Sequence, residues 1–208
     1  QIEPYPAHLT EEDTASPALA GMTGYRALVT KGEVTKEDTV FIPGGSSGVA
    51  TYIIQIAKAL GARVITSSRD EKKRQQLEDL GADLVLQTNE DWVAALQDET
   101  ITLVIEAVGR ATFNRSLEVL QRGGRLVVFG ATTEDTVELD LRTFFYNQQR
   151  IIGSTMACRE ELRQFLSLMA QHKLKPVIDR AYPLAEAASA MKRLEQSEQF
   201  GKVVLEMN

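Results

Sequence analysis

The residue types that bind a phosphate group occur together in one short segment, Gly44-Gly45-Ser46-Ser47-Gly48-Val49-Ala50. This segment lies between an apolar run and a stretch of helical period. In such a strand–turn–helix unit, backbone N–H groups and the positive end of the helix dipole face the pyrophosphate of a dinucleotide. Gly45 and Ala50 match the first and third positions of the pattern G-x-G-x-x-G/A. Ser47 stands at the second position, where a Cβ crowds the phosphate.

Two further observations bear on how specific this turn is. The hydroxyls of Ser46 and Ser47 are donors that could offset the missing second glycine. Taken alone, the motif is as compatible with a purely structural turn as with a phosphate-binding one. The strand before it, the helix after it and a second strand at the expected distance favour nucleotide binding. We therefore predict that the cofactor-binding residues of this turn are Gly45, Ser46, Ser47, Gly48 and Val49.

The end of the next β-rich run, Thr66-Ser67-Ser68-Arg69-Asp70, bears on which dinucleotide would bind. An NAD site usually carries Asp or Glu about 20 residues beyond the glycines, where it accepts hydrogen bonds from the ribose hydroxyls. Ser68 stands at that position and Arg69 follows it. The small serine side chain leaves space for the 2′-phosphate of NADPH, and the serine hydroxyl and the guanidinium can donate hydrogen bonds to it. We predict NADPH as the cofactor, bound here by Ser67, Ser68, Arg69 and Lys73. The alternative is that Arg69, Lys72 and Lys73 are the solvated start of a helix.

The composition argues against several other kinds of protein. The formal charge of −6 is spread along the chain, whereas a nucleic-acid partner would require a basic face. Cys158 is the single cysteine, and with His8 and His172 it provides neither an internal disulfide nor a cluster with metal-ligand spacing. No apolar run approaches a membrane span and no signal segment opens the chain, so we expect no membrane contact and a cytoplasmic location.

A repeated pattern of strands and helices must position these residues. From residue 39 onward, short β-rich runs alternate with segments of helical period, which is typical of a doubly wound parallel α/β sheet with right-handed crossovers. The predicted strands cover residues 40–42, 64–66, 84–86, 103–105, 126–129, 151–153 and 203–205. The predicted helices cover residues 48–60, 71–80, 91–96, 111–120, 159–172 and 185–194, with Asp70 as an N-cap.

Several ordered motifs are similar to those of the medium-chain dehydrogenase/reductase superfamily, especially its quinone oxidoreductase-like and alcohol dehydrogenase-like members. Besides the glycine turn and Ser67-Ser68-Arg69, they are Ala20-Gly21-Met22-Thr23-Gly24-Tyr25, Leu80-Gly81-Ala82-Asp83, Gly123-Gly124-Arg125-Leu126, Ile152-Gly153-Ser154-Thr155, Lys173-Leu174-Lys175-Pro176 and Phe200-Gly201-Lys202-Val203-Val204. Motifs in this order over nearly the whole chain are more specific than one glycine pattern. The resemblance implies a Rossmann-like dinucleotide-binding domain of an oxidoreductase.

The resemblance also implies further contacts with the cofactor. It places Thr23 near the nicotinamide, Val108 and Gly109 at its ribose side, and Lys202 at the pyrophosphate. The cofactor cleft would be lined by Gly130, Ala131, Thr132 and Ser154. The alternative for each of these residues is a turn or core position.

The chain differs from this superfamily in two ways that affect its expected metal content and its activity in isolation. Leu19 stands where zinc-using relatives have a cysteine ligand, so we predict no metal. The family's catalytic domain precedes this portion, so we interpret residues 1–20 as its remnant or a linker, 21–172 as the nucleotide-binding domain and 173–208 as a segment that returns to the catalytic domain. The catalytic residues are unknown from this sequence, and we expect the chain alone to be inactive.

The function that the resemblance implies is NADPH-dependent hydride transfer between the nicotinamide and a small-molecule carbonyl, quinone or activated alkene. Two alternatives stay open: a non-catalytic NADPH-binding sensor or interaction module, and an enoyl reductase domain of a multidomain synthase. The resemblance also implies a homodimer joined at sheet edges, with residues 144–154 as the edge strand. The alternative is that Phe144, Phe145 and Tyr146 pack under the first domain.

Overall fold

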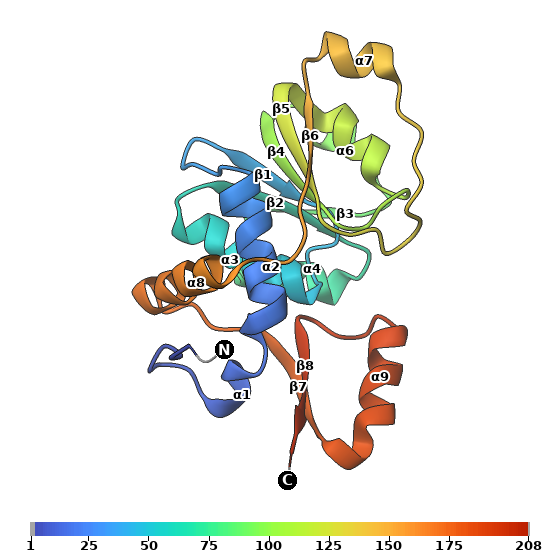
Figure 1. Ribbon diagram of the computed structural model, residues 1–208. Helices are drawn as coiled ribbons and strands as arrows, with labels where there is room; N and C mark the ends of the chain where they lie inside the picture. The colour runs from blue at the N-terminus through green and yellow to red at the C-terminus, as the bar shows by residue number, and fades with distance from the viewer. Residues whose placement is uncertain (1–2, 208) are drawn as a thin grey trace.

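A single parallel sheet forms the centre of the protein (Figure 1). The computed structural model describes residues 3–207. All neighbouring strands of this six-stranded sheet are parallel, and their order is β3-β2-β1-β4-β5-β6. The strands are β1 (Thr39–Ile42), β2 (Arg63–Ser68), β3 (Leu84–Gln87), β4 (Ile101–Glu106), β5 (Leu120–Val128) and β6 (Arg150–Gly153). The order reverses between β1 and β4, so the predicted doubly wound, Rossmann-like fold is confirmed.

Helices cover both faces of the sheet, namely α3 (Gly48–Ala59), α4 (Glu71–Asp79), α5 (Trp92–Ala95), α6 (Phe113–Val119) and α8 (Arg159–His172). Successive strand residues point to opposite faces. Val40 and Ile42 therefore join the core under α3, α4 and α8, whereas Phe41 joins the core under α5 and α6. The rings of Phe41 and Trp92 meet edge-on, with 4.8 Å between centroids. Among residues 3–207, no helix is long and apolar enough to cross a membrane.

The sequence pattern does not predict the helical segment before β1. After a short helix α1 (Glu11–Thr14), this segment comprises η1 (Pro17–Gly21), α2 (Met22–Tyr25) and η2 (Arg26–Lys31), and both η stretches have π-type turns. Glycines usually indicate a loop, but a Cβ at Gly21 would lie 2.3 Å from Cε1 of Phe165 in α8. A Cβ at Gly24 would lie 3.0 Å from Cγ1 of Ile53 in α3. The glycines thus allow close helix packing, which is a tertiary effect.

The C-terminal segment forms a second, two-stranded parallel sheet. It consists of β7 (Ile178–Pro183), η3 (Leu184–Glu186), α9 (Ala187–Glu195) and β8 (Lys202–Glu206). In Figure 1 this unit lies at the opposite end of the molecule from α7 (Leu141–Tyr146). A bridge between Ser47 and Gly201 connects it to the glycine turn. The division of the chain after residues 20 and 172 stays a prediction.

The predicted edge strand at residues 144–154 is wrong in its first part. Residues 141–146 form the helix α7, and only β6 pairs with β5. The reason is local, because the Asp140 carboxylate accepts hydrogen bonds from the N–H groups of Arg142 (2.9 Å) and Thr143 (3.2 Å) and so caps a helix. β6 is still the last strand of the sheet.

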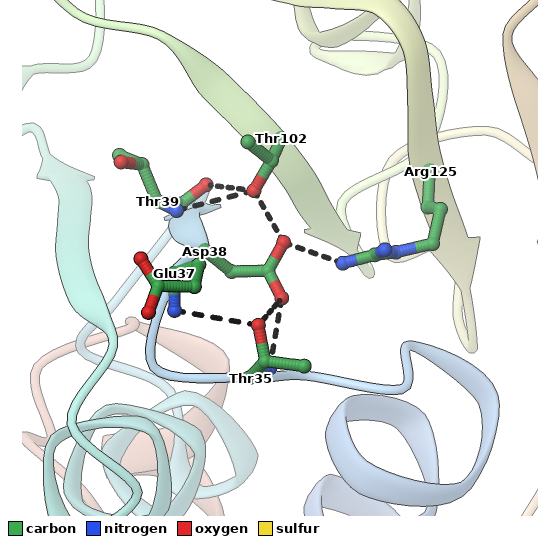
Figure 2. Close-up of polar contacts among 6 residues, drawn as sticks. All are labelled: Thr35, Glu37, Asp38, Thr39, Thr102 and Arg125. Atoms are coloured by element: carbon green, nitrogen blue, oxygen red, sulfur yellow. Dashed lines mark hydrogen bonds and ion pairs between the residues drawn. The ribbon is translucent and has the colours of Figure 1, made fainter.

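The buried carboxylate of Asp38 joins the amino ends of β1 and β4 to the middle of β5 (Figure 2). It accepts hydrogen bonds from the N–H of Thr35 (2.8 Å), the hydroxyl of Thr102 (2.6 Å) and the guanidinium of Arg125 (2.5 Å). Burial alone would raise the pKa of Asp38. The hydrogen bonds from Thr102 and Thr35 and the charge of Arg125 outweigh burial, so the pKa is lowered overall. This cluster therefore clamps the strands at the edge opposite to the glycine turn.

Candidate functional site

The turns that follow β1 and β4 lie side by side at the carboxyl edge of the sheet. Gly44 has a φ of +72°, and a Cβ there would lie 3.4 Å from Cγ2 of Val108. Because the strand order reverses between β1 and β4, these turns border the position at which open α/β sheets bind ligands, and we refer to that position as the crevice. The structure therefore brings the predicted turn at Gly45 next to the predicted residues Val108 and Gly109.

Gly45 is required by the close packing of its turn against the end of β2. Its N–H donates a hydrogen bond to the carbonyl oxygen of Ser67 at the end of β2 (3.0 Å), and a Cβ would lie 2.1 Å from Oγ1 of Thr66. Ser47 is exposed and is the N-cap of α3, where its hydroxyl oxygen accepts a hydrogen bond from the N–H of Ala50 (3.2 Å). Ser47 thus starts the helix where the pattern expects a glycine, and its O–H can still donate to an anion.

The start of β8 crosses the first residues of α3. The N–H of Gly201 donates to the carbonyl oxygen of Ser46 (3.0 Å). A Cβ on Gly48 would lie 2.6 Å from Cδ of Lys202, so the aliphatic stem of Lys202 passes directly over the start of the helix. The lysine charge and the helix dipole therefore both favour an anion at this end of α3.

Hydroxyl and basic groups occupy the end of β2. Ser68 is buried and Arg69 is exposed. Ser67 is fully buried and its hydroxyl oxygen accepts a hydrogen bond from the N–H of Gly44 (3.4 Å), so it braces the glycine turn from within. The Nζ of Lys73 donates to the carbonyl oxygen of Ser197 (2.6 Å), and burial lowers the pKa of this lysine. Arg69 therefore remains the exposed cation of the predicted set, whereas Lys73 is tied to the C-terminal segment.

The loops after β4 and β5 are hydrogen-bonded to each other. The N–H of Thr133 donates to the carbonyl oxygen of Val108 (2.8 Å). Gly109 has a φ of +91°, and a Cβ there would lie 2.4 Å from the carbonyl oxygen of Glu134. The loop after β5 therefore lies beside Val108 and Gly109. This loop contains three of the predicted cleft residues, Gly130, Ala131 and Thr132.

The two remaining predicted residues lie in α2 and directly after β6. Thr23 is half-buried and precedes Gly24, which packs on α3. The N–H of Ser154 donates to the carbonyl oxygen of Val128 (2.8 Å) at the carboxyl edge of the sheet. The buried hydroxyl of Ser154 has no hydrogen-bond partner among residues 3–207. Such a group is costly unless a ligand or a water molecule satisfies it.

One buried carboxylate at this edge is absent from the sequence-based predictions. Glu106 is the last residue of β4 and has no exposed surface. It accepts hydrogen bonds from the N–H groups of Val108 and Gly109 (2.7 and 3.2 Å). The signal in the sequence is an acidic residue at the end of an apolar run, which a solvated strand end would explain equally well.

The acidic, histidine and cysteine side chains of the structure are scattered. Within the described range 3–207, no three or more His, Cys, Asp or Glu side chains gather as a metal site would require. Leu19, where the resemblance would place a zinc-binding cysteine, is 58% exposed. The described residues therefore do not fit a zinc ion.

The chain is similar to known proteins along most of its length. The family model for zinc-binding dehydrogenases matches residues 48–171. Crotonyl-CoA reductase from Streptomyces collinus is 30% identical, and the match covers 98% of this chain and 51% of that protein. A solved 2-octenoyl-CoA carboxylase reductase in complex with NADP and 2-octenoyl-CoA has a TM-score of 0.93 and 30% identity, over 99% of this chain and 52% of that one. A solved NAD-dependent alcohol dehydrogenase has a TM-score of 0.92 and 34% identity, over 99% and 62%.

The region that the family model matches covers part of the site described above. It begins at the first residue of α3 and continues into α8, so it includes the carboxyl ends of β2, β4, β5 and β6, whereas β1 and the glycine turn lie before it and Lys202 lies after it. The chain spans about half the length of the curated relatives it matches. The chain belongs to the zinc-binding dehydrogenase family and is the nucleotide-binding portion of a medium-chain dehydrogenase/reductase.

Proposed function

We propose that this chain is the nucleotide-binding portion of an NADPH-dependent oxidoreductase that transfers a hydride between the nicotinamide and an activated alkene, quinone or carbonyl. The observation that carries the proposal is that the turns after β1 and β4 meet where the strand order reverses, with Lys202 over Gly48 at the start of α3. The helix dipole and the lysine charge both favour a pyrophosphate there. The similarity to a solved NADP complex supports this assignment.

The residues of this chain would bind and orient the cofactor, which itself supplies the hydride when bound. The first N–H groups of α3 and the hydroxyl of Ser47 would donate to the pyrophosphate, and Lys202 would balance its charge. Val108 and Gly109, together with the loop after β5, would form the wall on the nicotinamide side. A polar ligand group at this edge would also give the buried hydroxyl of Ser154 a partner.

The choice of NADPH rests on the end of β2. Ser68 places no carboxylate where it would repel a 2′-phosphate, and the exposed guanidinium of Arg69 can bind one. Overall similarity does not decide between the cofactors, because the chain is similar both to a protein in complex with NADP and to an NAD-dependent dehydrogenase. Lys73 is held by Ser197, so we assign the larger part of the preference to Arg69.

Calorimetric titration of the chain with NADPH and NADH tests this proposal. We expect NADPH to bind on the order of tenfold more tightly, because a hydrogen bond to a charged group contributes about 1.5–3 kcal/mol. Arg69→Ala should remove most of that preference. Lys36→Ala, at a highly exposed lysine beside the opposite sheet edge, should not change it. Equal affinity for both cofactors would contradict the choice of NADPH, and binding of neither would contradict the proposed function.

We favour an activated alkene conjugated to a thioester as the substrate class. The support is that one relative is named crotonyl-CoA reductase, and that a similar solved structure contains 2-octenoyl-CoA with NADP. NADPH oxidation by the protein in its full natural length should be measured with crotonyl-CoA, a quinone and a ketone in turn. We expect the protein to turn over crotonyl-CoA faster than the quinone and the ketone, or to turn over crotonyl-CoA only. Tight NADPH binding without turnover of any substrate would instead favour a non-catalytic module.

We also propose a homodimer that forms at the β6 edge of the sheet. The helix before this edge strand, α7, exposes large apolar side chains, with exposed fractions of 59% for Phe145 and 61% for Tyr146. Their rings stack with 5.0 Å between centroids. An open strand edge next to exposed apolar side chains is a typical interaction surface. Light scattering should give a dimer mass that Ile151→Lys in β6 reduces to a monomer mass, and a monomeric natural sequence would contradict the proposal.

A further inference from the structure

Glu106 is a buried charged group that the proposed cofactor contacts do not use. Its hydrogen-bond donors within residues 3–207 are all uncharged. Two are the N–H groups of Val108 and Gly109 (2.7 and 3.2 Å), which belong to the turn after β4. The other two are hydroxyls, those of Thr112 (2.9 Å to each carboxylate oxygen) and Ser116 (2.9 Å), at the start of α6. The carboxylate therefore bridges the turn and the helix that follows it.

The side chain of Thr112 holds Glu106 and does not cap its own helix. Thr112 is the N-cap residue of α6, yet its hydroxyl makes no hydrogen bond to the N–H groups of the helix. It donates to both oxygens of Glu106 instead. The Thr112 side chain is therefore oriented toward the carboxylate of Glu106, and α6 lacks the hydrogen bond that an N-cap hydroxyl normally accepts from its own helix.

The turn that Glu106 holds is also in contact with its neighbours in the crevice. The N–H and the hydroxyl of Thr133 both donate to the carbonyl oxygen of Val108 (2.8 and 2.7 Å). On the other side, Cγ2 of Val108 lies 3.4 Å from the position of a Cβ on Gly44. A shift of the turn would therefore change both the crevice wall formed by the loop after β5 and the contact with the glycine turn.

We propose that Glu106 is a positioning residue that fixes the turn at residues 107–109 against the glycine turn and so shapes the nicotinamide half of the crevice. A buried carboxylate without a cation is costly, and an apolar side chain of similar size would fill a core position at lower cost. A glutamate at position 106 is therefore explained better by a role in fixing the turn than by a role in core packing. This inference rests on the proposed binding of NADPH.

Two ligands distinguish the two halves of the crevice. NADPH extends through both halves, whereas adenosine 2′,5′-bisphosphate contains the adenosine end alone. Glu106→Gln keeps the length of the side chain but removes its charge and replaces one acceptor oxygen with a donor. Thr112→Val keeps the shape of the side chain but removes the hydroxyl that contacts both oxygens. We expect NADPH to bind about tenfold more weakly to Glu106→Gln and about threefold more weakly to Thr112→Val, with less than about a twofold change for the bisphosphate.

Asp38→Asn is the matched control, because Asp38 is the buried carboxylate at the opposite end of the same sheet. This variant should lose stability while the affinities for both ligands stay unchanged. Equal weakening of both ligands in Glu106→Gln would overturn the proposal, because it would indicate general damage to the fold. An unchanged NADPH affinity in both Glu106→Gln and Thr112→Val would also overturn it. If Glu106→Gln does not fold, Thr112→Val decides.

A natural-sequence chain that binds neither ligand would contradict the proposed function rather than the positioning role. In that case amide hydrogen exchange still tests Glu106. The amides of Val108 and Gly109 should exchange faster in Thr112→Val than in the natural sequence, and no faster in Asp38→Asn. Equal exchange in Thr112→Val and the natural sequence would show that the bridge does not hold the turn.

Discussion

Two buried carboxylates lie at opposite ends of the same sheet, and different groups satisfy them. At the amino end, Asp38 pairs with the cation Arg125 and joins three strands. At the carboxyl end, Glu106 is held, within residues 3–207, by N–H and hydroxyl donors alone. The first arrangement compensates a charge and clamps strands that are already paired. The second controls a turn whose conformation no strand pairing determines, and it borders the crevice.

The largest effect on stability should come from breaking the amino-end pair. Arg125→Met keeps much of the side-chain volume but leaves the carboxylate of Asp38 buried without its cation, so the free energy of unfolding should fall by about 3 kcal/mol. Urea denaturation measures this change. Arg122→Met, at an exposed arginine three residues earlier in β5, is the control. If the free energy of unfolding fell by less than about 1 kcal/mol, or if the affinity for NADPH fell, the two ends of the sheet would not differ in role as described.

A smaller effect is expected from filling the glycine turn at the carboxyl end. In Gly45→Ala the new Cβ would lie 2.1 Å from Oγ1 of Thr66, so the turn must shift and the free energy of unfolding should fall by about 2 kcal/mol. NADPH affinity should fall by more than about tenfold, since the turn would no longer face the pyrophosphate. Gly153→Ala, where a Cβ meets nothing within 4 Å, is the control for stability. Unchanged NADPH affinity in Gly45→Ala would contradict the assignment of this turn.

Removing the charge over α3 should have a more modest effect, confined to binding. Lys202→Met keeps the aliphatic stem over Gly48 and removes the ammonium, so NADPH should bind about 1 kcal/mol more weakly. The difference from the natural sequence should shrink at high salt, because salt screens exposed charges. Titrations with NADPH at two salt concentrations measure this difference. Lys175→Met, at another exposed lysine, is the control and should leave the affinity for NADPH unchanged. A loss of stability without a loss of affinity would indicate that Lys202 serves packing.

The smallest effect is the pH dependence of the amino-end cluster. The pKa of Asp38 is lowered in the folded protein below its ordinary value of 3.8. A lowered pKa means that the folded state binds this proton less readily than the unfolded state does. The stabilisation is therefore fully present above the unfolded pKa and is lost as the pH falls through the folded one. The stability difference between the natural sequence and Asp38→Asn should be constant near neutral pH and shrink below about pH 4. Denaturation at several pH values measures it, and a constant difference down to acid pH would contradict the assignment.

Local patterns predicted most of the fold. Buried parallel strands appear as short apolar runs, so all six strands of the main sheet were identifiable from residues such as Val40 and Leu103. Helix starts such as Asp70 were identifiable because N-cap chemistry involves residues close in sequence. The helical segment at residues 17–31 was not, because its glycines are explained by contact with Phe165, which lies far away in the sequence. The helix at Leu141–Tyr146 was missed although its cap, Asp140, was present.

The sequence by itself determined the fold class and the turns at the carboxyl edge, because strand period, helix caps and glycine turns depend on residues close together in the chain. The roles of individual residues as cofactor ligands stay predictions. Only the tertiary structure decided which groups meet: Lys202 lies over Gly48, Lys73 is tied to Ser197, and Glu106 is enclosed by donors from a turn and a helix. The physical reason is that contacts between distant segments depend on how the sheet and its helices pack, and no local pattern encodes them.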